Sequence, residues 1–205
     1  MPEIRTPRLR LVPGTPAALR AELDSPRALA AVLGLEVPPS WPPELYDAGA
    51  VRWMLDRLET HPEDAAWGFY YVAEAARRAD AADSAVGGAA RGLVVGAGGY
   101  MGPPKAGGAV EIGYSIVPER RRRGYAREAV DGWLANAFAD PRVTRVLAHT
   151  LPALAPSIAV LRSAGFAFAG PGGDAQEPAV VQYVLTRETY EGSGPARAPV
   201  RIGPA

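Results

Sequence analysis

The sequence predicts an α+β fold, in which helices are layered against a β-sheet. Segments whose apolar residues alternate at every second position are interleaved with segments whose apolar residues recur every three or four positions. The sharpest change of period separates "AVEIGYSIV", residues 109–117, which predicts a strand, from a helical stripe that begins after Gly124. Of the 205 residues, 48% are hydrophobic, so the chain can bury one substantial core.

The N-terminal half is predicted to begin and end with strands. In the first strand, residues 5–14, leucines alternate with arginines. Thr15 fits a helix N-cap and Pro16 the first helical position, and Pro26 splits residues 15–34 into two short helices. The other elements expected in this half are a helix at 42–64, a strand at 67–77, a glycine-rich connection at 77–92 and a strand at 92–102.

The C-terminal half continues the alternation of strands and helices. The helix after Gly124 is expected to end at Asp140, and a shorter helix is expected at 156–165. Further strands are predicted at 142–150, 167–170 and 179–188. One domain is therefore expected to cover residues 1–190, and residues 191–205, which have few large apolar groups, are expected to form a disordered tail.

Charge and composition exclude several classes of function. The 22 acidic and 22 basic residues balance, which argues against a nucleic-acid binder, because such proteins depend on a net basic surface. The chain has no cysteine and two histidines, which excludes disulfides, thiolate zinc sites and a multi-histidine metal centre. No signal-like segment and no apolar run of membrane-spanning length is present, so a soluble cytoplasmic protein without a membrane partner is expected.

The stretch "VEIGYSIVPERRRRGYAREAV" sets four arginines, Arg120 to Arg123, directly before Gly124 and the predicted helix. It could be a basic patch for nucleic acid or a cradle for a phosphate-bearing small molecule. The first amides of a helix have no partner within the helix, and the helix dipole adds partial positive charge there. Gly124 lets a ligand approach the backbone, Ala126 is small, and arginines add charge-assisted hydrogen bonds. With zero net charge, the phosphate cradle is the preferred interpretation.

The spacing Arg121-x-x-Gly124-x-Ala126 resembles the acetyl-CoA signature of the GNAT superfamily of N-acyltransferases. Downstream, "RVLAHTLPALAPSIAVLRSAGF" looks like a later segment of the family. The opening "IRTPRLRL" is similar to the branch that includes ribosomal-protein N-terminal alanine acetyltransferases. The resemblance implies a mixed, mostly antiparallel sheet of about six to seven strands, flanked by helices. This sheet would be splayed at its centre, between the strands at 109–117 and 142–150.

The resemblance also implies an activity, the direct transfer of an acetyl group from acetyl-CoA to a primary amine. The acceptor would be a protein N-terminal α-amine or the amine of a small molecule. The pantetheine arm would pair with the backbone of Ile116 and Val117, and the pyrophosphate would bind residues 122–127. The cofactor-binding residues implied in this way are Ile116, Val117, Arg121, Arg122, Arg123, Gly124, Tyr125, Ala126 and Arg127. The expected partners are acetyl-CoA and the amine, without nucleic acid, and a homodimer is compatible with the resemblance.

Two residues are implied to take part in the chemistry. Glu111 matches the carboxylate that takes the proton of the amine in the family, directly or through water, and the alternative is an ordinary strand glutamate in a salt bridge. Ser157 matches a serine that is frequent in the branch, and the alternative is a serine that bonds its own helix start. His149 is expected to be a strand residue rather than a base.

Two departures from the family pattern motivate a second hypothesis. Leu154 stands where the branch commonly carries an asparagine that contacts the cofactor arm, and Leu161 stands where many relatives have a tyrosine. Together they suggest a catalytically silent acyl-CoA-binding regulatory module. The helices of the first third, expected to form the acceptor side, do not separate a protein α-amine from a small amine.

Overall fold

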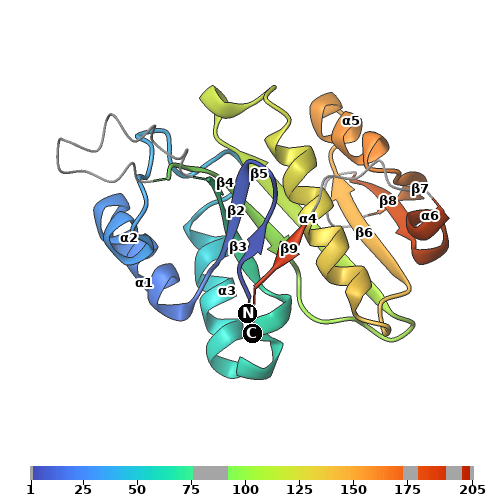
Figure 1. Ribbon diagram of the computed structural model, residues 1–205, viewed down its shortest axis with the longest axis horizontal. Helices are drawn as coiled ribbons and strands as arrows, with labels where there is room; N and C mark the ends of the chain where they lie inside the picture. Colours follow the sequence, from blue (N-terminus) through green and yellow to red (C-terminus); the bar gives the residue numbers. More distant parts are fainter. Residues whose placement is uncertain (1, 76–91, 173–179, 193–199, 204–205) are drawn as a thin grey trace.

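The computed structural model describes residues 2–75, 92–172, 180–192 and 200–203. Within these ranges the strands are β1 (Ile4–Arg5), β2 (Leu9–Pro13), β3 (Phe69–Glu74), β4 (Val94–Tyr100), β5 (Ala109–Ile116), β6 (Arg145–Thr150), β7 (Ala167–Pro171), β8 (Val181–Thr186) and β9 (Arg201–Ile202). The helices are α1 (Pro16–Asp24), α2 (Pro26–Leu33), α3 (Ala48–Thr60), α4 (Tyr125–Ala139), α5 (Ala155–Ser163) and α6 (Arg187–Gly192). The α+β prediction is confirmed (Figure 1).

All nine strands belong to one sheet, in the order β7-β8-β6-β5-β4-β3-β2-β1-β9. Every neighbouring pair is antiparallel except β5 and β6, which run parallel, so the sheet is mixed and mostly antiparallel, as expected. The strand number exceeds the expected six to seven because β1 and β9, of two residues each, extend one edge. Among the described residues, no helix combines the length and the apolar character needed to span a bilayer.

Side-chain caps set the N-terminal boundaries of the first two helices, and the cap at Thr15 is the one that the sequence predicts. The hydroxyl of Thr15 accepts a hydrogen bond from the amide of Ala18 at 3.2 Å, and the hydroxyl of Ser25 accepts one from Ala28 at 3.1 Å. Gly34 ends α2 in the left-handed conformation, with φ 65°. Local signals therefore suffice to place these helices.

Three predicted elements differ in extent from the structure. The strand expected at 179–188 ends at Thr186, and residues 187–192 form α6, a helix that was not predicted. The strand expected at 5–14 is a hairpin of β1 and β2, because Pro7 has no amide hydrogen for a ladder and lies in the turn between them. The helix expected at 42–64 is shorter, since α3 begins after its N-cap Asp47 and ends at Thr60. Most of the glycine-rich connection expected at 77–92 lies outside the described residues.

Part of the tail expected to be disordered belongs to the sheet. Arg201 and Ile202 form β9 and pair with β1, with Ile4 opposite Ile202. The expectation of disorder is therefore wrong for residues 200–203, and also for residues 191–192, which end α6. An edge strand offers free backbone hydrogen-bonding groups, so a segment with few large apolar side chains can still pair with it. Residues 193–199 and 204–205 lie outside the described ranges.

Two apolar cores lie on opposite faces of the sheet. One core joins α4 to buried residues of many strands, among them Leu11, Val110 and Val146. The other core joins α1, α2 and α3 to β3 and β4, through residues such as Leu58 and Tyr71. The helices of the first third thus cover β3 and β4 but not the strands beyond β5.

The sheet divides at its centre. β5 and β6 pair only over residues 109–112 and 145–148, in parallel, and each strand then continues without the other. Beyond this point β5 still pairs with β4, and β6 still pairs with β8. The sheet is therefore splayed where the resemblance implied, and the opening lies between the end of β5 and the end of β6.

Candidate active site

A cavity of about 950 Å³ occupies the opening between β5 and β6. One side of it is formed by β5 from Gly113 to Ile116 and by the loop that leads into α4. The other side is formed by residues 149–151 at the end of β6 and by α5. Residues of α3 and of the loop before it complete the lining on the face of the sheet opposite α4. The cavity therefore runs from the first turn of α4 to the point where the two strands diverge.

The start of α4 presents unpaired backbone amides to this cavity. The first helical hydrogen bond runs from the Glu128 amide to the Gly124 carbonyl at 3.0 Å, so the amides of residues 125–127 have no partner within the helix. Arg122 and Gly124, which both line the cavity, have positive φ angles of 58° and 80°. Such an arrangement suits an anion.

The nine residues implied to bind the cofactor do not all lie at the cavity. Ile116, Arg121, Arg122, Gly124, Tyr125, Ala126 and Arg127 line it, and Val117 and Arg123 do not. The amide of Val117 donates to the Val95 carbonyl at 3.0 Å, so it is committed to the sheet. Because alternate residues of an antiparallel ladder direct their amides to opposite sides, the amide of Ile116 faces away from β4, toward the opening.

The arginine side chains of the loop are largely held by other residues. Arg121 donates from Nε to the Ile116 carbonyl at 2.9 Å and lies 3.0 Å from the Glu44 carboxylate. Arg127 lies 3.0 Å from Asp131 one turn along α4. These contacts place two positive charges at the cavity wall in fixed positions, and Arg122 is exposed beside them.

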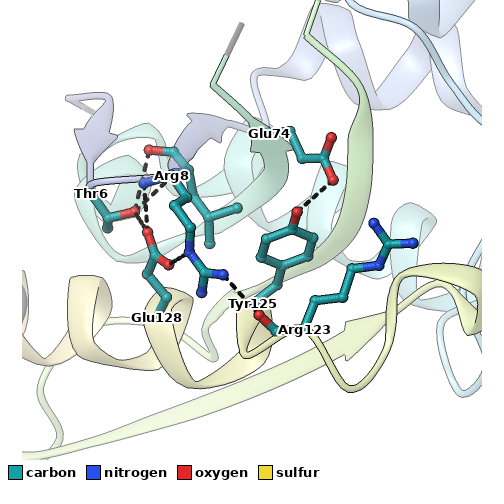
Figure 2. Close-up of polar contacts among 7 residues, drawn as sticks. Thr6, Arg8, Glu74, Arg123, Tyr125 and Glu128 are labelled. Atoms are coloured by element: carbon teal, nitrogen blue, oxygen red, sulfur yellow. Dashed lines mark hydrogen bonds and ion pairs between the residues drawn. The ribbon is translucent and has the colours of Figure 1, made fainter. Parts of the chain in front are cut away.

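A buried carboxylate ties the start of α4 to the N-terminal hairpin (Figure 2). Glu128, which is 7% exposed, accepts hydrogen bonds from the Thr6 hydroxyl at 2.5 Å and from the Arg8 amide at 2.8 Å, and pairs with the Arg8 guanidinium at 2.6 Å. Arg8 also donates to the Arg123 carbonyl at 2.9 Å, and its guanidinium lies 5.1 Å from the centre of the Tyr125 ring. Thr6, Arg8 and Glu128 were not predicted as site residues, although they lie in or beside the motifs that carry the resemblance.

Replacing Glu128 by glutamine should lower the free energy of unfolding by about 1–3 kcal/mol. The substitution removes a buried negative charge that pairs with the Arg8 guanidinium and accepts hydrogen bonds from the Arg8 amide and the Thr6 hydroxyl. Urea denaturation measures this loss. The control is Glu59→Gln, which breaks an exposed pair with Arg20 and should change stability by less than about 1 kcal/mol. Equal effects of the two substitutions would mean that the Glu128 contacts do not anchor α4.

Glu111 lies beside the cavity rather than in its wall. Its Oε1 is 2.7 Å from Nδ1 of His149, and its Oε2 is 3.9 Å from the Lys105 ammonium. His149 does line the cavity, and its Nε2 is 3.0 Å from the Gln182 amide nitrogen. With its hydrogen on Nδ1, the imidazole donates to Glu111 and accepts from Gln182. Glu111 is therefore held by polar partners, as the interpretation of an ordinary strand glutamate in a salt bridge expects. One of these partners, His149, lines the cavity and so connects Glu111 to it.

Ser157 lines the cavity next to an unpredicted hydroxyl. The Tyr114 hydroxyl donates to the Ser157 carbonyl at 3.2 Å and lies 3.4 Å from its Oγ. Burial raises the pKa of Tyr114 to about 12. Leu161, at the family position of a tyrosine, is buried in the core, and Leu154 lines the cavity. A phenol hydroxyl is therefore present at the cavity, but it comes from Tyr114 on β5 and not from position 161 on α5.

The wall on the α3 side is aromatic. Tyr46 lines the cavity, and its hydroxyl donates to the Glu22 carboxylate at 2.9 Å. Glu22 also accepts from Trp41 Nε1 at 2.8 Å and from the Tyr71 hydroxyl at 2.7 Å. Desolvation raises the pKa of Glu22 in spite of these donors. In the described part of the chain, no cluster of three or more His, Cys, Asp or Glu side chains forms a candidate metal site.

Residues 8–167 match the family model described as acetyltransferase (GNAT) domain. Among curated proteins, no significant match was found. Solved structures give many matches in fold. An acetyltransferase from Agrobacterium tumefaciens is 20% identical, with a TM-score of 0.59 and coverage of 91% of this chain and 95% of its own.

Two further structures similar in fold have named acceptors. The ribosomal-protein α-N-acetyltransferase RimL, in complex with coenzyme A, is 13% identical, with a TM-score of 0.60 and coverage of 90% of this chain and 97% of its own. The spermidine/spermine N-acetyltransferase SpeG from Vibrio cholerae is 14% identical, with a TM-score of 0.59 and coverage of 91% of this chain and 98% of its own. At these identities the likeness concerns the fold alone.

Proposed function

The chain belongs to the GNAT acetyltransferase family, and from this premise we propose that it transfers an acetyl group from acetyl-CoA directly to a primary amine. The observation that carries the proposal is the continuous cavity from the amide-rich start of α4 to the divergence of β5 and β6. It joins a site for an anion to a strand edge where the amide of Ile116 faces the opening and can pair with an extended ligand.

The residues of the cavity fit the parts of acetyl-CoA. The amides of residues 125–127 and the exposed guanidinium of Arg122 suit the pyrophosphate. Arg121 and Arg127 lie beside them and are paired with Glu44 and Asp131. The amide of Ile116 faces the opening and suits the pantetheine arm. Acetyl-CoA supplies an activated acetyl thioester, whose carbonyl carbon an amine can attack.

We assign removal of the amine's proton to the pair of Glu111 and His149. An alkylammonium cannot attack a thioester until it has lost a proton, so a base near the acyl group accelerates the transfer. The pair lies where β5 and β6 part, and the two side chains are 2.7 Å apart. A proton taken up by this pair can return to water, because both side chains are partly exposed.

The departing sulfur needs a hydrogen-bond donor, and we assign this role to Tyr114 and Ser157, which both line the cavity. A thiol has a pKa of about 8.5, so a phenol whose pKa is about 12 keeps its proton and stabilises the thiolate by hydrogen bonding. The proton that finally neutralises the sulfur then comes from water or from the amine. Ser157 shares this corner with Tyr114 and is proposed to contact the same sulfur.

A catalytically silent acyl-CoA-binding module is the competing function. It is favoured by Leu154, which lines the cavity and whose side chain cannot form a hydrogen bond to the cofactor arm. Release of free CoA from acetyl-CoA, measured against a panel of small amines and short N-terminal peptides, decides between the two. Release above the hydrolysis background with any amine supports transfer. Acetyl-CoA binding without release for any acceptor would support the silent module.

A further inference from the structure

Exposed apolar side chains gather in the cavity. The large apolar side chains that are exposed among the described residues are Val32, Leu45, Trp53, Met101, Phe168 and Ile202. Leu45, Trp53 and Met101 all line the same cavity. Exposed apolar groups that converge on a concave surface indicate a ligand with apolar groups of its own.

The apolar wall adjoins the acyl-transfer end of the cavity. Met101 follows β4, and its methyl group lies over Gly113, since a Cβ built there would be 2.8 Å from Cε of Met101. Gly113 is the first residue of β5 beyond the stretch that pairs with β6, and it is two residues from Glu111. An amine delivered to the Glu111–His149 pair would therefore bring its substituent against this wall.

Carboxylates are scarce around this wall. Among the described residues that line the cavity, Glu44 is the single carboxylate, and it is paired with Arg121 at 3.0 Å. Glu22 lies behind Tyr46, and its carboxylate already accepts hydrogen bonds from three side chains. The Glu111–His149 pair can receive one ammonium group, but the wall offers no comparable partner for a second.

We propose that the acceptor is an amine with a single positive charge, carried next to an apolar side chain or ring. The proposal rests on the acetyl transfer assigned to this cavity and names the chemical class of its acceptor. A polyamine would place its further ammonium groups against Trp53 and Met101, where they would lose hydration without gaining a carboxylate. A peptide that begins with a large apolar residue and a small arylalkylamine share the required chemistry.

Competition among acceptors tests the class directly. We expect phenethylamine or a methionine-initiated peptide to have a kcat/KM at least about tenfold above that of glycinamide, which has no apolar substituent, and of spermidine. Comparing kcat/KM for phenethylamine with kcat/KM for the methionine-initiated peptide shows whether the acceptor is a small molecule or a protein N-terminus. A kcat/KM for spermidine equal to or above that of the apolar amines would overturn the proposal while leaving acetyl transfer in place.

Binding gives a second readout that does not depend on turnover. In the protein loaded with CoA, phenethylamine should raise Tm and spermidine should not, because only the former buries an apolar group in the native state. This shift, together with no CoA release from acetyl-CoA in the separate amine assay, would support the class of amine that binds and contradict the transfer reaction. A shift with spermidine alone would contradict the acceptor class.

Trp53 provides a residue-level test. Its side chain is 49% exposed, so Trp53→Ala should leave the fold intact and lower kcat/KM for phenethylamine by about tenfold, with little change for glycinamide. The matched control is Phe168→Ala, which removes an aromatic side chain that is 59% exposed outside the cavity lining and should change neither value. Equal losses for both amines in Trp53→Ala would show that Trp53 does not contact the acceptor's substituent.

Discussion

Replacing Glu111 by glutamine should lower kcat by about 10²- to 10⁴-fold, with little change in acetyl-CoA binding. The amide keeps the size of the side chain and can still accept a hydrogen bond from His149, but it can no longer take up a proton. Activity should recover in part at high pH, because free amine accumulates there without a base. The measurement is kcat against pH, together with an acetyl-CoA titration.

Substitution of His149 tests whether Glu111 and His149 act together in catalysis or form only a salt bridge. If Glu111 and His149 act as a unit, the double variant Glu111→Gln/His149→Gln should lose about as much kcat as the more damaging single variant. The control is Lys105→Gln, which removes a mostly exposed ammonium 3.9 Å from Glu111 and should change kcat by less than about threefold. Near-normal kcat in Glu111→Gln across the pH range would identify Glu111 as a structural residue.

Replacing Gly124 by valine should abolish the rise in Tm that acetyl-CoA produces. Gly124 has φ 80°, where a β-branched residue is strained, and a Cβ there would lie 3.2 Å from Nη2 of Arg8. The side chain would also stand at the start of α4, among the amides proposed to bind phosphate. Mass action on the native state makes the Tm shift a direct report of binding.

Gly34 offers a control with the same backbone conformation. It caps α2 with φ 65°, and a Cβ there meets no atom within 4 Å. Gly34→Val should therefore cost stability of about 1–2 kcal/mol through the left-handed conformation and leave the acetyl-CoA shift unchanged. If Gly124→Val kept a normal shift, the loop before α4 would not be the phosphate site.

Much of the fold could be predicted from the sequence because its signals are local. The caps Thr15 and Ser25 and the stop at Gly34 act within a few residues of the helix ends that they set. The arginine run and Gly124 mark the start of α4 in the same way. These signals express backbone preferences and apolar periodicity, which neighbouring residues determine.

The partners of the candidate site were decided by the tertiary structure. The register of β5 with β6 brings Glu111 to His149, and the register of β6 with β8 sets Gln182 opposite His149. The packing of α4 on the hairpin brings Glu128 to Arg8. The sequence alone determined the motif that resembles an acetyl-CoA site, because a helix start is built from adjacent residues. Strand register and helix packing decide what surrounds that site, because they bring together residues far apart along the chain. In this way they set the partners of Glu111, the contact of Glu128 with Arg8 and the apolar wall.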